Sequence, residues 1–272
     1  MTAIKVFSGT AHPVLAESIC HHLGVPLGRS HVVRFSNENI KVRIDENVRG
    51  ADVFVVQPSC PPVSDGLLEL LIFIDALKYA SAERITAVIP YFGYSTMERA
   101  VKPGEVVTAK TRARLISSIP ACEGGTRVFL FDLHTDGIEF YFGDSHVTHH
   151  IYGSTVITAA IRARMGDRPF VLGATDAGRA KWVQSLAQDL GVEPAFIYKR
   201  RDSTTGKLAL TGINADVRGQ PVMIYDDMIR TGSSLLQAGR AYLAAGATEV
   251  HAIASHVVRS EEHTSELQSH HV

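Results

Sequence analysis

The sequence predicts an α/β fold made of two doubly wound parallel-sheet domains. Short apolar runs of strand character alternate with helical segments along almost the whole chain. Several of these runs contain no polar residue, which is typical of strands that helices cover on both faces. Connections of this kind between parallel strands are right-handed crossovers. A chain of 272 residues is long enough to give each of two domains its own core.

The expected elements fall into two series. In the first, strands are expected at Ile4–Phe7, His31–Phe35, Val53–Gln57, Ile85–Ile89 and Val128–Asp132, and helices at Gly66–Ala80 and Thr108–Ile119. In the second, strands are expected at Phe170–Gly173, Ala195–Tyr198, Val222–Tyr225 and Val250–Ser255, and helices at Ser154–Met165, Ala177–Leu190 and Leu235–Ala245. The series divide near His149–Ser154, which predicts one domain over residues 1–150 and another over residues 151–259.

The end of the chain differs in character from the rest. Residues 260–272 are polar, rich in His and Ser, and without hydrophobic periodicity. We expect them to be a tail foreign to the fold; a native disordered terminus is the alternative. The His pairs at 149–150 and 270–271 are expected at the surface and not as metal ligands, because carboxylates do not accompany them at a defined spacing.

Composition excludes several classes of function. The 28 acidic and 27 basic side chains nearly cancel, so neither nucleic acid nor a membrane surface is an expected partner. The cysteines Cys20, Cys60 and Cys122 are far apart, which indicates neither a zinc site nor a disulfide framework and suits a reducing cytoplasm. The N-terminus lacks a signal-peptide pattern, and no apolar run reaches membrane-spanning length.

The most informative segment is VMIYDDMIRTGSSL, which begins at Val222. An apolar strand leads into Asp226 and Asp227, and the small residues at 231–234 precede a helix. Two carboxylates can accept hydrogen bonds from a vicinal diol such as that of ribose, or hold a divalent cation. A helix N-terminus rich in hydroxyls and free amides suits a phosphate group. The alternative is an ordinary helix start with capping residues and no ligand.

Two other strand ends carry candidate ligands. His134 and nearby carboxylates follow the strand that ends at Asp132, where an imidazole can ligate a metal that bridges phosphates, or simply hold a turn. Asp176 precedes Ala177 and Gly178 at the start of a predicted helix. This aspartate can be a plain N-cap, or a metal ligand beside amides that cradle pyrophosphate.

The segment Tyr198–Arg201 carries three consecutive cations at the exit of a predicted strand. They can form a solvated loop, or they can stabilise the negative charge of a phosphoryl group in transfer. The polar stretch that follows suits a lid that excludes water. The chain has no P-loop, no G-x-G-x-x-G after a strand and no nucleophile elbow.

In their order along the chain, these motifs resemble those of the ribose-phosphate pyrophosphokinases, or phosphoribosyl pyrophosphate (PRPP) synthetases. The similarity runs from Val6 to about Val258. It includes RFSNENIKVRIDENVRG, PPVSDGLLELLIFIDALK, IPYFGY, TAKTRARLI and AGATEVHAIASHVV. Phosphoribosyltransferases share only the loop at residues 226–234, so the synthetase interpretation is favoured.

The resemblance implies two phosphoribosyltransferase-like domains and transfer of the diphosphoryl group of ATP to ribose 5-phosphate, with Mg²⁺ as cofactor. It also implies that dimers assemble into larger rings, expected to be hexamers. It assigns ATP contacts to Phe35, Asn37 and His134, metal contacts to His134 and Asp176, and the pyrophosphate loop to Asp176, Ala177 and Gly178. It assigns the transition-state cations to Lys199 and Arg201, and the ribose 5-phosphate site to Asp226, Asp227, Thr231, Gly232, Ser233 and Ser234.

The chain departs from the family pattern at several positions. The family commonly has an acid at position 39, Arg-Gln at 96–97, Gly at 179 and Asp at 230, where this chain has Asn39, Thr96, Met97, Arg179 and Arg230. By resemblance, the C-terminal domain is incomplete, with roughly fifty further residues expected beyond Val258. These differences keep two alternatives open, a non-catalytic paralogue that regulates true synthetases and a phosphoribosyltransferase.

Overall fold

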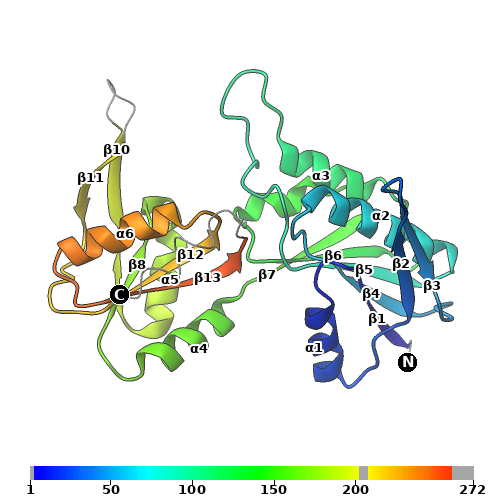
Figure 1. Ribbon diagram of the computed structural model, residues 1–272, viewed down its shortest axis with the longest axis horizontal. Helices are drawn as coiled ribbons and strands as arrows, with labels where there is room; N and C mark the ends of the chain where they lie inside the picture. Colours follow the sequence, from blue (N-terminus) through cyan, green and yellow to red (C-terminus); the bar gives the residue numbers. More distant parts are fainter. Residues whose placement is uncertain (1–2, 202–207, 259–272) are drawn as a thin grey trace. The chain divides into compact units, whose positions relative to one another are not determined.

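The computed structural model describes residues 3–201 and 208–258 (Figure 1). The side chains of residues 199–201 and 208–211 and the predicted tail at 260–272 lie outside this description. The chain divides into two compact units, Met1–Tyr152 and Gly153–Val272, and each is described here by itself. In the described part, no helix is long and apolar enough to cross a lipid bilayer.

The first unit is built on a five-stranded parallel sheet with the order β1-β4-β5-β6-β7. Its strands are β1 (Ile4–Ser8), β4 (Asp52–Val56), β5 (Arg84–Ile89), β6 (Thr126–Phe131) and β7 (His146–Ile151). Its helices are α1 (Pro13–Leu23), α2 (Val63–Tyr79), α3 (Thr108–Ser117) and the 3-10 helix η1 (Asp136–Tyr141).

Helices cover both faces of this sheet. Figure 1 shows α2 and α3 on one face and α1 on the other. Phe7 and Val55 belong to the core shared with α2 and α3, whereas Val6 and Val56 pack against α1. Such alternation is the period-two pattern of a strand buried on both faces. The apolar runs of the sequence therefore have the burial that their composition predicts.

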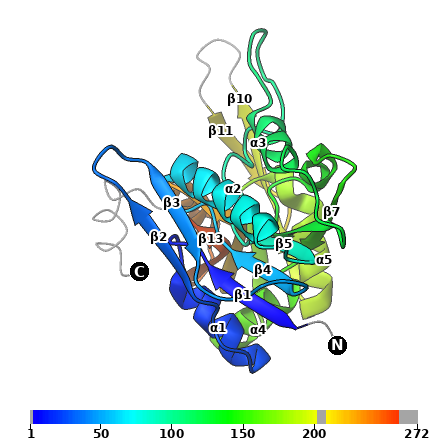
Figure 2. The same cartoon turned by 90° about the vertical axis from the view of Figure 1, so that its right-hand side faces the viewer.

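A separate antiparallel hairpin precedes β4 in the chain. It consists of β2 (Ser30–Arg34) and β3 (Ile40–Ile44), which pair with each other and with no strand of the parallel sheet in the described chain (Figure 2). The strand expected at His31–Phe35 therefore exists, but it belongs to this hairpin. The sequence analysis missed β3, β7 and α1.

The second unit is built on a four-stranded parallel sheet with the order β13-β12-β8-β9. Its strands are β8 (Val171–Ala174), β9 (Glu193–Ala195), β12 (Val222–Ile229) and β13 (Val250–Val257). Its helices are α4 (Ser154–Met165), the 3-10 turn η2 (Ala177–Arg179), α5 (Ala180–Leu190) and α6 (Ser233–Ala244). The antiparallel ribbon of β10 (Ile197–Arg201) and β11 (Leu208–Ile213) stands out from this sheet (Figure 1). The single strand expected at Ala195–Tyr198 is therefore wrong: it is divided between β9 and β10, which belong to different sheets, and β11 was not expected.

One buried tyrosine joins three elements of the second unit. Tyr242 on α6 is fully buried. Its hydroxyl donates to the carbonyl oxygens of Ala174 (2.9 Å) or Ala195 (3.0 Å) and accepts from the amide of Ala174 (3.2 Å). Because Ala174 is the last residue of β8, this hydroxyl fixes the point at which the chain leaves the sheet.

Two predicted boundaries were wrong in ways that affect the site. The strand expected to end at Tyr225 continues to Ile229, so Asp226 and Asp227 lie inside β12. The cations Lys199–Arg201 lie inside β10 and not after a strand. In both cases pairing with a neighbouring strand, Met228 with His256 and Lys199 with Leu210, extends the strand beyond its apolar run.

We predict that Tyr242→Phe destabilises the second unit by about 1–3 kcal/mol, because a buried amide and two carbonyls lose a hydrogen-bond partner. Denaturant unfolding monitored by circular dichroism measures the change. Tyr79→Phe is the matched control, since Tyr79 is 86% exposed and its loss should cost less than about 0.5 kcal/mol. Equal stability of the two variants would contradict the anchoring role of Tyr242.

Candidate functional site

The polar residues of the second unit gather where β8 and β12 separate. The two strands pair in parallel, and the last matched residues are Ala174 and Tyr225. Thr175 and Asp226, the next residues of the two strands, are therefore neighbours, and the Thr175 hydroxyl donates to the Asp226 carboxylate at 3.2 Å. In parallel sheets this carboxyl edge is where ligands bind.

Asp226 has an environment that favours its protonated form. Burial, together with the adjacent Asp227 carboxylate, raises the pKa of Asp226 to about 7. The hydrogen bond from Thr175 and one from the Asp227 amide, at 3.0 Å, act in the opposite direction. Near neutral pH, Asp226 can therefore both accept and donate hydrogen bonds to a hydroxyl pair.

Asp227 is held by an ion pair that the sequence analysis did not foresee. An Arg179 Nη2 nitrogen contacts its Oδ2 oxygen, and both side chains are largely buried. Arg179 ends the turn that follows β8, so the contact joins the two predicted ligand loops. The signal in the sequence was the charged residue at a position where the family pattern has glycine.

The turn between β12 and α6 exposes the residues predicted to hold a phosphate. Gly232 has a φ of 76°, which a residue with a side chain rarely adopts, and it is the N-cap of α6 without a side-chain hydrogen bond. The hydroxyls of Thr231 and Ser233 lie 2.8 Å apart, and Thr231, Ser233 and Ser234 are exposed. Gly232 caps α6 without a side chain, and the amide of Ser233 donates to the Thr231 hydroxyl at 3.4 Å.

The turn after β8 has a different arrangement. The Asp176 carboxylate accepts a hydrogen bond from the Gly178 amide at 2.8 Å, in the manner of a helix cap. The amides of Ala177 and Gly178 lie in this exposed turn. A ligand that took the Gly178 amide would have to displace the Asp176 carboxylate, which would then be free to bind a cation.

Lys199 and Arg201 lie in β10, which pairs with β11. Their side chains lie outside the described residues, so their approach to the site stays a prediction. The predicted lid, residues 202–207, also lies outside the description.

His134 belongs to the first unit and follows a constrained turn. Asp132, which is buried, has a φ of 40°, a left-handed value that is costly for residues other than glycine. The next amide, that of Leu133, donates to His150 Nε2 at 2.9 Å. Burial lowers the pKa of His150, which keeps its Nε2 lone pair available for this bond. His150 was expected at the surface, but its side chain is only 4% exposed, and it supports the turn that presents His134.

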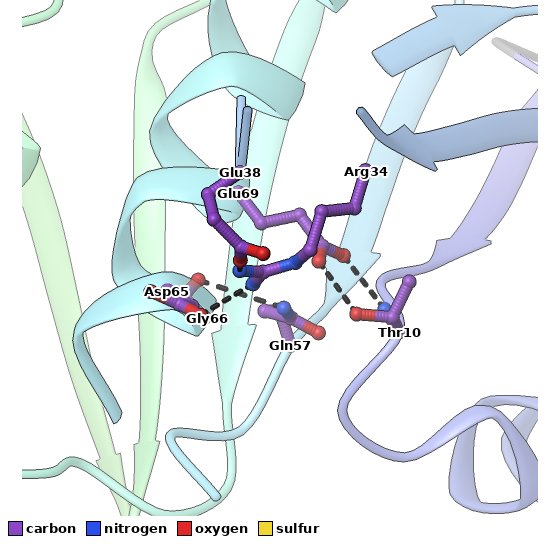
Figure 3. A network of polar contacts seen from close by, with 7 residues as sticks. All are labelled: Thr10, Arg34, Glu38, Gln57, Asp65, Gly66 and Glu69. Carbon is purple, nitrogen blue, oxygen red and sulfur yellow. Dashed lines mark hydrogen bonds and ion pairs between the residues drawn. The ribbon is translucent and has the colours of Figure 1, made fainter. Parts of the chain in front are cut away.

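Phe35 and Asn37 lie at the tip of the β2–β3 hairpin. The Phe35 side chain is exposed, and its amide donates to the Asn39 carbonyl at 2.9 Å. Arg34 contacts both Glu38 in the tip and Asp65 in the first turn of α2 (Figure 3). An exposed aromatic ring on a tethered hairpin is suited to stacking on a planar ligand.

The loop between β1 and α1 is fixed by two side chains, that of Glu69 from α2, drawn in Figure 3 with Thr10, and that of Gln57, which follows β4. The buried Glu69 accepts from the amide of Thr10 at 2.7 Å and from its hydroxyl at 2.5 Å. The amide of Ala11 donates to Gln57 at 3.2 Å. These amides already have partners, so this edge of the first unit is not an open phosphate site.

No set of three His, Cys, Asp or Glu side chains among the described residues is close enough to hold a metal ion. The described residues therefore offer separate carboxylates, such as Asp176 and Asp226 in the second unit, and not a complete set of metal ligands. Magnesium commonly binds in this way, through one or two carboxylates together with substrate phosphates and water. The donors present fit Mg²⁺ that arrives with a phosphorylated ligand.

Comparisons with known proteins point to one enzyme family along almost the entire chain. Residues 4–119 match the family described as the N-terminal domain of ribose phosphate pyrophosphokinase, and residues 155–270 match the phosphoribosyl transferase domain family. A ribose-phosphate pyrophosphokinase of Wolinella succinogenes is 39% identical over 96% of this chain and 82% of its own length. The enzyme of the same name from Shewanella oneidensis is 43% identical over 96% of this chain and 81% of its own length.

A solved structure is similar to this chain over almost its entire length. The crystal structure of phosphoribosylpyrophosphate synthetase from Mycobacterium smegmatis matches with a TM-score of 0.87 and 34% identity. The match covers 98% of this chain and 86% of that protein. The α/β class with parallel sheets, predicted from the sequence, is confirmed.

The raised pKa of Asp226 predicts a pH-dependent stability. Between its ordinary value of 3.8 and about 7, the folded protein keeps a proton that the unfolded chain has lost, so wild-type stability falls as pH rises. Asp226→Asn should remove this pH dependence. As the pH rises over that range, the free energy of unfolding of the variant should increase relative to that of the wild type by at most about 1.4 kcal/mol per pH unit before solvent screening. Thermal unfolding from pH 4 to pH 8 measures the slope.

Asp216→Asn is the control, because Arg218 lowers the pKa of Asp216 to about 2. The stabilisation by ionised Asp216 is complete above the ordinary pKa of 3.8 and is lost only as the pH falls toward 2. The change in unfolding free energy caused by Asp216→Asn should therefore be constant between pH 4 and pH 7. A constant effect of Asp226→Asn over the same range would show that Asp226 is ionised like an ordinary carboxylate.

Proposed function

The chain belongs to the ribose-phosphate pyrophosphokinase family, and we propose on this premise that its second unit binds ribose 5-phosphate at the β12–α6 turn. The reaction is the transfer of the diphosphoryl group of ATP to ribose 5-phosphate, which gives 5-phosphoribosyl 1-diphosphate and AMP. Two observations support the proposal, family membership along almost the entire chain and the arrangement of this turn.

The observation that carries the proposal is that a carboxylate pair lies only a few residues before a helix whose N-cap residue, Gly232, offers no side-chain hydrogen bond. Asp226 and Asp227 bind the two ribose hydroxyls, and the groups at 231–234 bind the 5-phosphate. The hydroxyls of Thr231 and Ser233 and the amides at the start of α6 supply donors, while Gly232 lets the backbone approach closely. Each end of the sugar phosphate thus meets the chemistry that suits it.

The remaining predicted roles concern ATP and Mg²⁺. Phe35 and Asn37 contact the nucleotide from the hairpin tip, and His134 contacts it from the turn after β6. Asp176 binds Mg²⁺, and Ala177 and Gly178 bind the diphosphate through their amides. When bound, Mg²⁺ would neutralise charge on the transferring group. His134 and Asp176 belong to separately described units, so their joint action is part of the proposal.

Lys199 and Arg201 stabilise the transition state. The transferring group spreads negative charge over its oxygens, and cations in a closed site lower the energy of that charge. We further propose that the chain self-associates through dimers into a hexamer, as the resemblance implies. The three cysteines are free thiols, which suits a cytoplasmic setting.

The sequence left two other functions open. The departures at Asn39, Thr96, Met97, Arg179 and Arg230 favour a non-catalytic regulatory paralogue. The Asp226–Ser234 loop alone would also suit a phosphoribosyltransferase. Against both, the chain keeps His134, Asp176, Lys199 and Arg201 in addition to that loop.

We predict that the protein releases AMP from ATP only when both ribose 5-phosphate and Mg²⁺ are present. A coupled AMP assay with each component omitted in turn is the measurement. No AMP under any condition would favour the regulatory paralogue. Consumption of PRPP and a base without ATP would identify a phosphoribosyltransferase.

We predict that Lys199→Ala or Arg201→Ala lowers kcat on the order of 10³-fold with little change in KM, because their charge acts mainly in the transition state. Arg200→Ala, between them in β10, is the matched control and should stay near wild type. Steady-state kinetics of the three variants decide the matter. Near-normal turnover of Lys199→Ala and Arg201→Ala would show that these cations are solvent-exposed residues of the ribbon with no catalytic role.

A further inference from the structure

We propose that the guanidinium of Arg179 balances the charge of Asp226 and Asp227, the carboxylates assigned to the sugar. In the substrate-free protein it takes the place that a divalent cation would otherwise occupy beside these carboxylates. The inference rests on the proposed function, because it concerns the carboxylates assigned to ribose 5-phosphate. It adds a residue that determines whether the sugar requires a cation for binding.

The first observation is the burial of the ion pair. The side chain of Arg179 is 17% exposed and that of Asp227 is 5% exposed. A buried charge is strongly unfavourable unless it is paired, so the contact with the oppositely charged group stabilises each of them. The exposed pair of Arg218 and Asp216 in the same unit, 2.9 Å apart, gains little from such a contact, because water solvates both ions.

The second observation is the crowding of negative charge. Asp226 and Asp227 are adjacent in β12, and Asp226 is fixed by Thr175 and by the Asp227 amide. The Asp227 carboxylate is among the groups that raise the pKa of Asp226, so the two carboxylates together attract either a proton or a cation. The guanidinium of Arg179 supplies that positive charge from the turn after β8.

The consequence concerns the sugar. A ribose diol is neutral and brings no charge to balance the carboxylates. With Arg179 in place, the diol can bind to a carboxylate pair whose negative charge is already partly balanced. Without it, a divalent cation would be attracted to the pair, and sugar binding would depend on that cation.

The test uses Mn²⁺ as a spectroscopic probe, added to the substrate-free protein and measured by electron paramagnetic resonance. Arg179→Gln should bind Mn²⁺ on the order of tenfold more tightly than wild type, because a repelling charge is removed and a carboxylate pair is freed. Arg179→Lys keeps the charge and should match wild type. Arg218→Gln, which removes the exposed guanidinium, should also match wild type.

A double variant assigns the new affinity to this site. Arg179→Gln combined with Asp227→Asn should lose the gain, since the freed carboxylate is then neutral. Unchanged Mn²⁺ affinity in Arg179→Gln would overturn the proposal, as would a gain that survives in the double variant.

Calorimetry with the wild-type protein gives a second test that needs no variant. Ribose 5-phosphate should bind with the same affinity, within about twofold, in Mg²⁺ and in a chelator, because the counter-cation is part of the chain. Binding that requires Mg²⁺ would overturn the inference and leave the proposed function intact. Failure to bind ribose 5-phosphate under either condition would instead overturn the proposed function, and the Mn²⁺ results would still decide the role of Arg179.

Discussion

The parallel pairing of β8 with β12 is the constraint on which the candidate site depends. It ends at Ala174 and Tyr225, and the Tyr242 hydroxyl holds β8 at that point. Beyond it β12 continues along β13 alone, so Asp226 and Asp227 lie on a strand with one free side. The turn after β8 fills part of that side with Thr175 and Arg179. The open side at which we propose a sugar site is therefore a consequence of unequal strand lengths.

Much of this arrangement could be predicted from local sequence. The apolar runs before Asp132, Asp176 and Asp226 placed these residues at the carboxyl edges of parallel sheets, because apolar strands and polar strand ends are local features. The extension of β12 to Ile229 could not be predicted in this way, since pairing with β13 decides it. The alternating residues of β3 (Ile40–Ile44) and the proline-to-glycine span of α1, from Pro13 to Gly24, were readable signals that the sequence analysis overlooked.

The electrostatics of the site could be predicted least. The sequence has almost balanced charge, which says nothing about which carboxylate is ionised. In the structure, Asp227 is paired with a guanidinium, whereas burial next to it raises the pKa of Asp226. Two adjacent residues of the same type thus have different roles, because one contacts Arg179 and the other contacts Thr175. Only the folded contacts make this distinction.

The central claim is that the β12–α6 turn binds ribose 5-phosphate, and amide chemical shifts test it most directly. With ¹⁵N-labelled protein titrated with ribose 5-phosphate, we expect saturable shifts for residues 226–227 and 231–234, with smaller changes in the turn at 175–179. Ribose without its phosphate should change the amide chemical shifts of residues 226–227 and leave those of residues 231–234 unchanged. Saturable shifts confined to other parts of the chain, with residues 226–234 unmoved, would contradict the account.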